Sequence, residues 1–172
     1  MRLLILFFAI IHISCTTHPR YEHTVDHVNM ENFEGTWYVI KGRFTPFERD
    51  VYNSIEHYTW HPDSQTIDIK FTYNRGSFTG KEVAIPQSGR IFNPDTNAHW
   101  KVSPFRPIEF DFLVIALAQD YSWTAIGVPN QNYLWIMFRE YAPSEQMIAH
   151  AVEHIKSLGY NTENLIRVKH QY

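Results

Sequence analysis

The chain has a single cysteine, and this scarcity excludes several kinds of protein. Cys15 stands alone among 172 residues, so no internal disulfide can form, and sites built on paired cysteines are impossible. Basic residues are not in excess, because 15 Lys and Arg face 18 Asp and Glu, for a formal net charge of -3. No basic stripe interleaved with aromatic residues is present, which argues against a nucleic-acid partner. The fold must therefore be stabilised by packing.

Long apolar runs are also few. Residues 3–11 form one such run after Arg2, but it is shorter than the roughly 20 apolar residues that a spanning helix needs. A positive start followed by a short apolar segment is typical of a signal peptide. The run ends in Ile13-Ser14-Cys15, as bacterial lipoprotein signals do, with His12 where leucine is usual. We therefore predict a signal peptide over residues 1–14 and acylation of Cys15, which would anchor the protein to a membrane.

Thr16 follows the cysteine, without the aspartate that retains lipoproteins in the inner membrane, which favours the outer membrane. Cleavage of an ordinary secretory signal nearby, with Cys15 incidental, is the alternative. Residues 15–28 are polar and lack periodicity, so they are predicted to form a tether. The folded domain is then predicted over residues 29–172.

Aromatic residues, in contrast, are abundant. They make up 16% of the chain, within an apolar share of 44%. Aromatic side chains favour strands and carry large apolar areas. This composition indicates a β protein with an aromatic-lined interior, and a solid β core is the alternative.

Short strand-like segments separated by turn residues fill most of the chain. The clearest runs from Thr66 to Tyr73, where apolar and polar residues alternate as in a strand with one buried face. Strands at regular spacing predict a sandwich or a barrel, and consecutive hairpins favour an up-and-down barrel. The predicted strands cover residues 37–44, 54–60, 66–73, 81–86, 99–103, 110–118, 122–128 and 133–139.

A predicted helix follows this series of strands near the end of the chain. Pro143 and Ser144 open residues 143–158 and Gly159 closes them, as helix ends prefer. Apolar residues recur at helical spacing and make one stripe, which only the barrel wall can bury. A last short strand, residues 165–168, is predicted beside the first.

Three short motifs resemble the signature of the lipocalins. Gly35 and Trp37 open the first strand, Asp120-Tyr121 occupies a turn, and Arg139 ends the last long strand. The chain resembles that family over nearly all of its mature length, and particularly its bacterial outer-membrane lipoproteins, a group related to apolipoprotein D. Gln119 departs from the usual threonine before Asp-Tyr.

The resemblance implies an all-β fold, an eight-stranded antiparallel up-and-down barrel with a C-terminal α-helix packed outside. It implies that Arg139 lies across Trp37 at the narrow end and that Ala116 points inward. In a cup-shaped barrel the loop after the first strand is the natural lid, with Phe47 either capping the mouth or filling the loop's own small core. Matching Tyr58 to the family's inward tyrosine puts Glu56 inside, whereas an outward, solvated Glu56 is equally compatible with the alternation. The predicted ligand pocket consists of Glu56, Tyr58, Trp60, Ile69, Phe71, Tyr73, Phe112, Val114, Tyr133 and Trp135.

A barrel of eight strands leaves room for one small ligand. The expected function is reversible binding of a fatty acid or lysophospholipid at the outer membrane, facing the periplasm, in lipid transport or envelope maintenance. No catalytic residue, cofactor or metal is expected, and a homodimer is possible. Two alternatives are a lipocalin-fold enzyme that acts on a lipid or carotenoid through Glu56, and an interaction module whose barrel is filled by its own aromatic residues.

Overall fold

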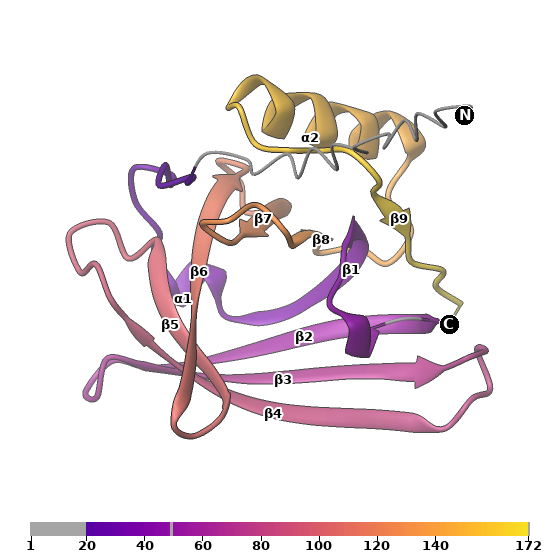
Figure 1. Cartoon of the computed structure of the whole chain (residues 1–172), viewed down its shortest axis with the longest axis horizontal. Helices are drawn as coiled ribbons and strands as arrows, with labels where there is room; N and C mark the ends of the chain where they lie inside the picture. Colours follow the sequence, from indigo (N-terminus) through magenta and orange to yellow (C-terminus); the bar gives the residue numbers. More distant parts are fainter. Residues whose placement is uncertain (1–19, 49, 172) are drawn as a thin grey trace, which may run out of the picture.

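The computed structural model describes residues 20–48 and 50–171 (Figure 1). The predicted signal peptide, Cys15 and the side chain of Phe47 lie outside the described part. The elements in chain order are α1 (Met30–Phe33), β1 (Gly35–Arg43), the 3-10 turn η1 (Pro46–Glu48), β2 (Val51–His61), β3 (Thr66–Arg75), β4 (Glu82–Ile91), β5 (His99–Phe105), β6 (Ile108–Leu117), β7 (Trp123–Gly127), β8 (Leu134–Phe138), α2 (Glu145–Ser157) and β9 (Ile166–Arg167).

The strands form one antiparallel sheet that closes on itself. Their order is β2-β3-β4-β5-β6-β7-β8-β1-β9, and an additional pairing between β1 and β2 completes the ring. The predicted eight-stranded up-and-down barrel with an outer C-terminal helix is therefore confirmed, and so is the last short strand beside the first, which is β9 next to β1. Of the described helices, none combines the length and the apolar character that crossing a bilayer requires.

The seam between β1 and β2 is short, and the end of the chain fills the rest of it. The two strands pair only from Gly35 to Tyr38, after which β1 turns towards β8 and β9. The backbone N–H of Val168 donates to the carbonyl of Ile40 at 2.9 Å. On the other side, the N–H of Asn53 donates to the carbonyl of Lys169, also at 2.9 Å. The C-terminal segment is thus part of the barrel wall.

Helix α2 covers the outer face of the barrel where β7 and β8 lie (Figure 1). The hydroxyl oxygen of Ser144 accepts from the N–H of Met147 and caps the helix N-terminus. Ile148, Ala151 and Ile155 then pack into an outer apolar cluster that also holds alternate residues of β8. Because β7 and β8 are covered on both faces, all of their residues are buried.

One predicted orientation is wrong. Ala116 belongs to the outer cluster under α2, together with its neighbour Ile115, whereas Val114 lies in the cluster inside the barrel. The pairing of β6 with β7 shifts register between Val114 and Ala116. A bulge adds one residue to a strand and reverses which face the following residues occupy. Simple alternation from Val114 therefore fails at Ala116.

Residues 21–28, from the predicted tether, lie along the barrel wall. Three main-chain N–H groups bond to the barrel: Tyr21 to Pro129 at 2.7 Å, Val25 to Val114 at 2.9 Å, and Val28 to Thr96 at 2.8 Å. The side chains of Tyr21 and Val28 are buried. Residues 21–28 of the predicted tether are therefore attached to the barrel.

Candidate ligand-binding cup

The closed end of the barrel is built around the indole of Trp37. Its Nε1 donates to the carbonyl of Phe33 at 2.8 Å, which ties β1 to the end of α1. The guanidinium carbon of Arg139 lies 3.8 Å from the centre of the Trp37 ring. The predicted cation–π contact is therefore confirmed.

Arg139 also bonds to the main chain around the indole. Its Nη1 donates to the carbonyl of Thr36 at 2.9 Å, and Nη2 to those of Asn32, Phe33 and Glu34 at 2.8, 3.0 and 2.9 Å. A guanidinium presents several donors in a fixed fork, which suits such a cluster of carbonyls.

Gly35 is required at the turn between α1 and β1. Its φ is +95°, a conformation that side chains with a Cβ rarely adopt, and an added Cβ would lie 3.3 Å from Arg139 Nη1. The glycine therefore allows both the turn and the close approach of the arginine.

The Asp120-Tyr121 turn lies against the same end. Asp120 Oδ1 accepts from the N–H of Ser122 at 3.0 Å, so the turn has a side-chain hydrogen bond although Gln119 replaces the usual threonine. The hydroxyl oxygen of Tyr121 accepts from the N–H of Asn29 at 2.9 Å. Asn29 caps α1, so this contact joins the turn to the helix that closes the barrel.

Four aromatic side chains fill the space above this base. Phe33 makes ring contacts with Trp37, Tyr58 and Trp100 at centroid separations of 5.1, 5.3 and 5.2 Å. All four rings are buried. The closed end of the barrel is therefore a packed plug, not a binding space.

A buried polar pair lies next to the plug. Glu56 is 5% exposed and Tyr58 is 1% exposed, so the question left open by the sequence is answered: Glu56 points inward. The hydroxyl of Tyr58 donates to Glu56 Oε2. Burial, together with the charge of Glu48, raises the pKa of Glu56 to about 7 despite the bond from Tyr58. Burial and the neighbouring carboxyl raise the pKa of Tyr58 well above its ordinary value.

At the open end, η1 folds over the mouth and reaches inward. The indole Nε1 of Trp135 donates to Glu48 Oε1 at 2.9 Å. Glu48 Oε2 accepts from both the backbone N–H and the hydroxyl of Thr45, at 3.0 and 2.6 Å. A groove of about 610 Å³ runs between this lid and the C-terminal segment, lined among others by Phe44, Glu48, Val51 and Tyr52. Solvent therefore has access to the rim of the barrel beside the lid.

The predicted pocket residues all lie on the inner face, but at different depths. Tyr58, Ile69, Val114 and Trp135 belong to the interior cluster, and Phe112 and Tyr133 pack against it while still partly exposed. Trp60 also packs against it but at the closed end, where its backbone N–H donates to Glu34 Oε2 at 3.3 Å and it borders a hollow with Asn29 and Met30, so it does not line the cup. Phe71 and Tyr73 are buried and pack together at 5.3 Å between ring centroids. Their partners on β4, Ile85 and Val83, are only half-buried. Inward apolar side chains therefore meet solvent towards the open end.

The sequence reasoning missed three residues that shape this interior. Phe33 and Trp100 complete the plug, and Glu48 joins the lid to Trp135. Phe33 and Trp100 were visible as aromatic residues, but no local pattern placed them together. Glu48 lies in a predicted loop, where alternation gives no direction.

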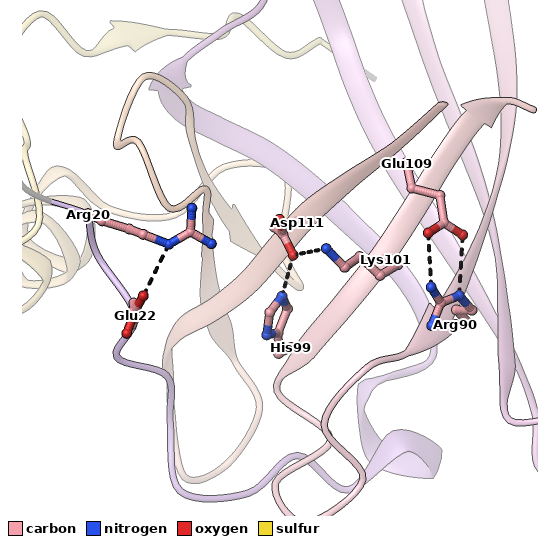
Figure 2. A network of polar contacts seen from close by, with 7 residues as sticks. All are labelled: Arg20, Glu22, Arg90, His99, Lys101, Glu109 and Asp111. Carbon is pink, nitrogen blue, oxygen red and sulfur yellow. Dashed lines mark hydrogen bonds and ion pairs between the residues drawn. The ribbon is translucent and has the colours of Figure 1, made fainter. Parts of the chain in front are cut away.

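Charged pairs lie on the outer face of β4, β5 and β6 (Figure 2). Asp111 Oδ1 accepts from His99 Nε2 at 2.6 Å and lies 2.5 Å from Lys101 Nζ. Arg90 donates to both carboxylate oxygens of Glu109 at 3.2 and 2.9 Å. These residues alternate with Trp100, Val102 and Phe112, which face inward, so none of the ion pairs enters the barrel. The described residues contain no group of acidic, His or Cys side chains arranged to hold a metal ion.

Comparison with known protein families decides the relationship. Residues 28–170 match the family model described as a Lipocalin-like domain. The chain belongs to the lipocalin family. This membership supports the binding of small hydrophobic molecules, and it confirms the resemblance drawn from Gly35, Trp37, Asp120-Tyr121 and Arg139.

Curated relatives include proteins named outer membrane lipoprotein Blc. The chain is 26% identical to the one from Vibrio cholerae, with 91% of each chain covered. It is 28% identical to those from Citrobacter freundii and Escherichia coli K12, with 94% of this chain and 90% of each relative covered. The predicted similarity to bacterial outer-membrane lipoprotein lipocalins is therefore confirmed.

Solved structures share the fold at lower identity. Lobster apocrustacyanin A1 matches with a TM-score of 0.64 and 16% identity over 84% of this chain and 81% of its own. Insecticyanin from the tobacco hornworm Manduca sexta has the same TM-score at 12% identity, over 88% and 87% of the two chains. The cockroach allergen Per a 4 gives 0.64 at 14% identity, over 91% and 97%. These likenesses show the barrel alone.

Proposed function

We propose that the protein binds one elongated apolar molecule, a fatty acid or lysophospholipid, in the open half of its barrel. The observation that carries this proposal is the contrast along the inner face. Below Glu56 the interior is packed with aromatic rings, whereas Phe112, Tyr133, Val83 and Ile85 are apolar, inward and partly exposed. Partly exposed apolar lining in a concave site is typical of a ligand pocket.

Burial of the acyl chain supplies the driving force. Each methylene group removed from water contributes about 0.8 kcal/mol. Loss of translational and rotational freedom offsets about 4–15 kcal/mol of that gain. A chain of roughly sixteen carbons contributes on the order of 13 kcal/mol by this measure, so it binds through few polar contacts where the cost lies in the lower part of that range.

The cell envelope is the proposed location. The relatives are named outer membrane lipoproteins, and the predicted signal ends at Cys15, the expected acylation site. Attachment to the outer membrane on its periplasmic side brings the barrel close to lipids released from the bilayer. Carrying or storing such lipids is the proposed role.

Native mass spectrometry tests the proposal directly. The chain from residue 16 onward contains the closed barrel, both apolar clusters and α2. Mixed with palmitate and with palmitoyl lysophospholipid, it is expected to retain one molecule of either ligand, and both are expected to displace an uncharged fluorescent dye. Absence of a retained lipid and of dye binding would instead support a barrel filled by its own side chains.

Turnover of a lipid is the second candidate, because Glu56 is a buried carboxyl group whose pKa of about 7 suits a general base. Mass analysis of candidate lipids and carotenoids after incubation distinguishes the two functions. A product that forms with the wild-type protein and not with Glu56→Gln would favour the enzyme.

A further inference from the structure

A carboxyl oxygen without a partner points into the barrel. Glu56 has Trp37 of β1 and Phe71 of β3 as its cross-strand neighbours, both apolar. Tyr58 donates to Oε2, and the described residues supply no donor to Oε1. Oε1 is not among the fully enclosed polar atoms that lack a partner, so it borders a space that a polar group can reach. Oε1 is therefore placed to accept a hydrogen bond from a ligand.

A second carboxyl group faces the same interior from the lid. Glu48 is held by Trp135 and Thr45, and its charge adds to the effect of burial in raising the pKa of Glu56. Two acidic groups that sense each other in a poorly solvated space repel an added anion and attract a cation. The two carboxyl groups therefore make the electrostatic potential of the interior negative.

The aromatic rings next to Glu48 also favour a cation over an anion. Trp135 stacks on Phe112 at 5.2 Å and contacts Tyr133 at 6.1 Å between ring centroids. Aromatic faces attract cations such as ammonium groups. Among the described residues near the rim, Arg75 donates to the Tyr73 hydroxyl at 3.2 Å, and Lys169 Nζ lies 5.8 Å from the centre of the Tyr52 ring.

Resting on the proposed ligand-binding function, we propose that Glu56 and Glu48 make the cup selective for the polar group of its ligand. Among amphiphiles of equal chain length, the cup prefers an ammonium group over a carboxylate, with an alcohol between them, so a fatty acid binds but more weakly than an amphiphile of equal length that carries an ammonium group. Glu56 is the specificity-determining residue, because its free oxygen lies deepest.

Three twelve-carbon ligands test this selectivity: dodecylamine, dodecanol and dodecanoic acid. Each displaces an uncharged fluorescent dye from the chain that begins at residue 16, at about pH 8, where Glu56 is mostly ionised. The wild-type protein is expected to bind the amine about tenfold or more tightly than the acid. Glu56→Gln is expected to abolish most of that preference and to change alcohol binding little.

Glu153→Gln is the matched control, because it makes the same chemical change at an exposed position of α2. It is expected to leave the amine-to-acid ratio as in the wild type. Equal or tighter binding of the acid by the wild type, or an unchanged ratio in Glu56→Gln, would overturn the selectivity while leaving the ligand-binding function intact. Failure of all three ligands to bind the wild type would overturn both proposals.

The wild-type protein also provides a test that needs no variant. The titratable groups that act on Glu56 are Tyr58 on its own strand and Glu48 on η1, since Trp37 and Phe71 do not titrate. Lowering the pH from about 8 to 6 protonates Glu56, so amine binding is expected to weaken and acid binding to strengthen. A merely structural role of Glu56 predicts parallel changes for both ligands, and that result would refute the proposal even if Glu56→Gln did not fold.

Discussion

The two ends of the barrel are lined by similar aromatic residues but are built for different purposes. At the closed end, Phe33, Trp37 and Trp100 are fully buried because α1 and Arg139 close over them. At the open end, Phe112 and Tyr133 remain partly exposed beside a lid of three residues, η1. The same residue type thus serves as core or as ligand-contacting surface, depending on what covers it.

The largest expected effect is at the closed end. Trp37→Ala removes the ring that contacts both Phe33 and Arg139, so it is expected to lower the free energy of unfolding by about 3–5 kcal/mol. Trp60→Ala, the same change at a partly exposed position, is expected to cost clearly less. Urea denaturation measures both. Equal losses would show that the plug is no more tightly packed than the rest.

The next largest effect is expected at Glu56, which lies between the packed closed end and the open end. Burial raises the pKa of Glu56 from an ordinary value of 4.5 to about 7, so its protonated form is favoured in the folded state. The stability from this group is fully present below pH 4.5 and is lost as the pH rises to about 7. The loss amounts to roughly 3 kcal/mol.

Thermal unfolding at a series of pH values checks this dependence. Glu56→Gln is expected to lose less stability than the wild type across that interval. Parallel curves for the two proteins would contradict a buried, titrating Glu56.

Substitutions of Arg139 test whether its charge or the geometry of its hydrogen-bond donors stabilises the closed end. Arg139→Met leaves the main-chain carbonyls of residues 32–34 and 36 without this donor and is expected to cost about 2 kcal/mol. Arg139→Lys keeps the charge but loses the fork, and is expected to recover only part of that stability. Chemical denaturation of the three proteins distinguishes these cases, and full recovery by lysine would assign the stability to charge alone.

The smallest effect on stability is expected at the open end. Phe112→Ala removes a partly exposed ring and is expected to cost about 1 kcal/mol, with affinity for palmitate falling about tenfold because Trp135 loses its stacking partner. Denaturation and dye displacement measure the two quantities on the same sample. A large loss of stability with unchanged affinity would place Phe112 in the core and not in the cup.

Much of the barrel was predictable from local patterns. Strict alternation in Thr66–Tyr73 identified the buried face of β3, and the capped apolar stripe identified α2. Gly35, Trp37 and Arg139 predicted the closed end. Ala116 was misplaced because a bulge is a property of two paired strands, and the register of the pair is not written in either strand alone.

The sequence by itself determined that strands with two unlike faces follow one another, and its resemblance to the lipocalins implied that Arg139 lies across Trp37. Only the tertiary structure decided that Glu56 faces the interior and that Glu48 reaches Trp135. The physical reason is that side chains alternate along a strand with a period of two residues. This alternation shows that the strand has two faces, but it does not show which face points into the closed barrel. Contacts such as Glu48 with Trp135, far apart in the chain, exist only once the ring has closed.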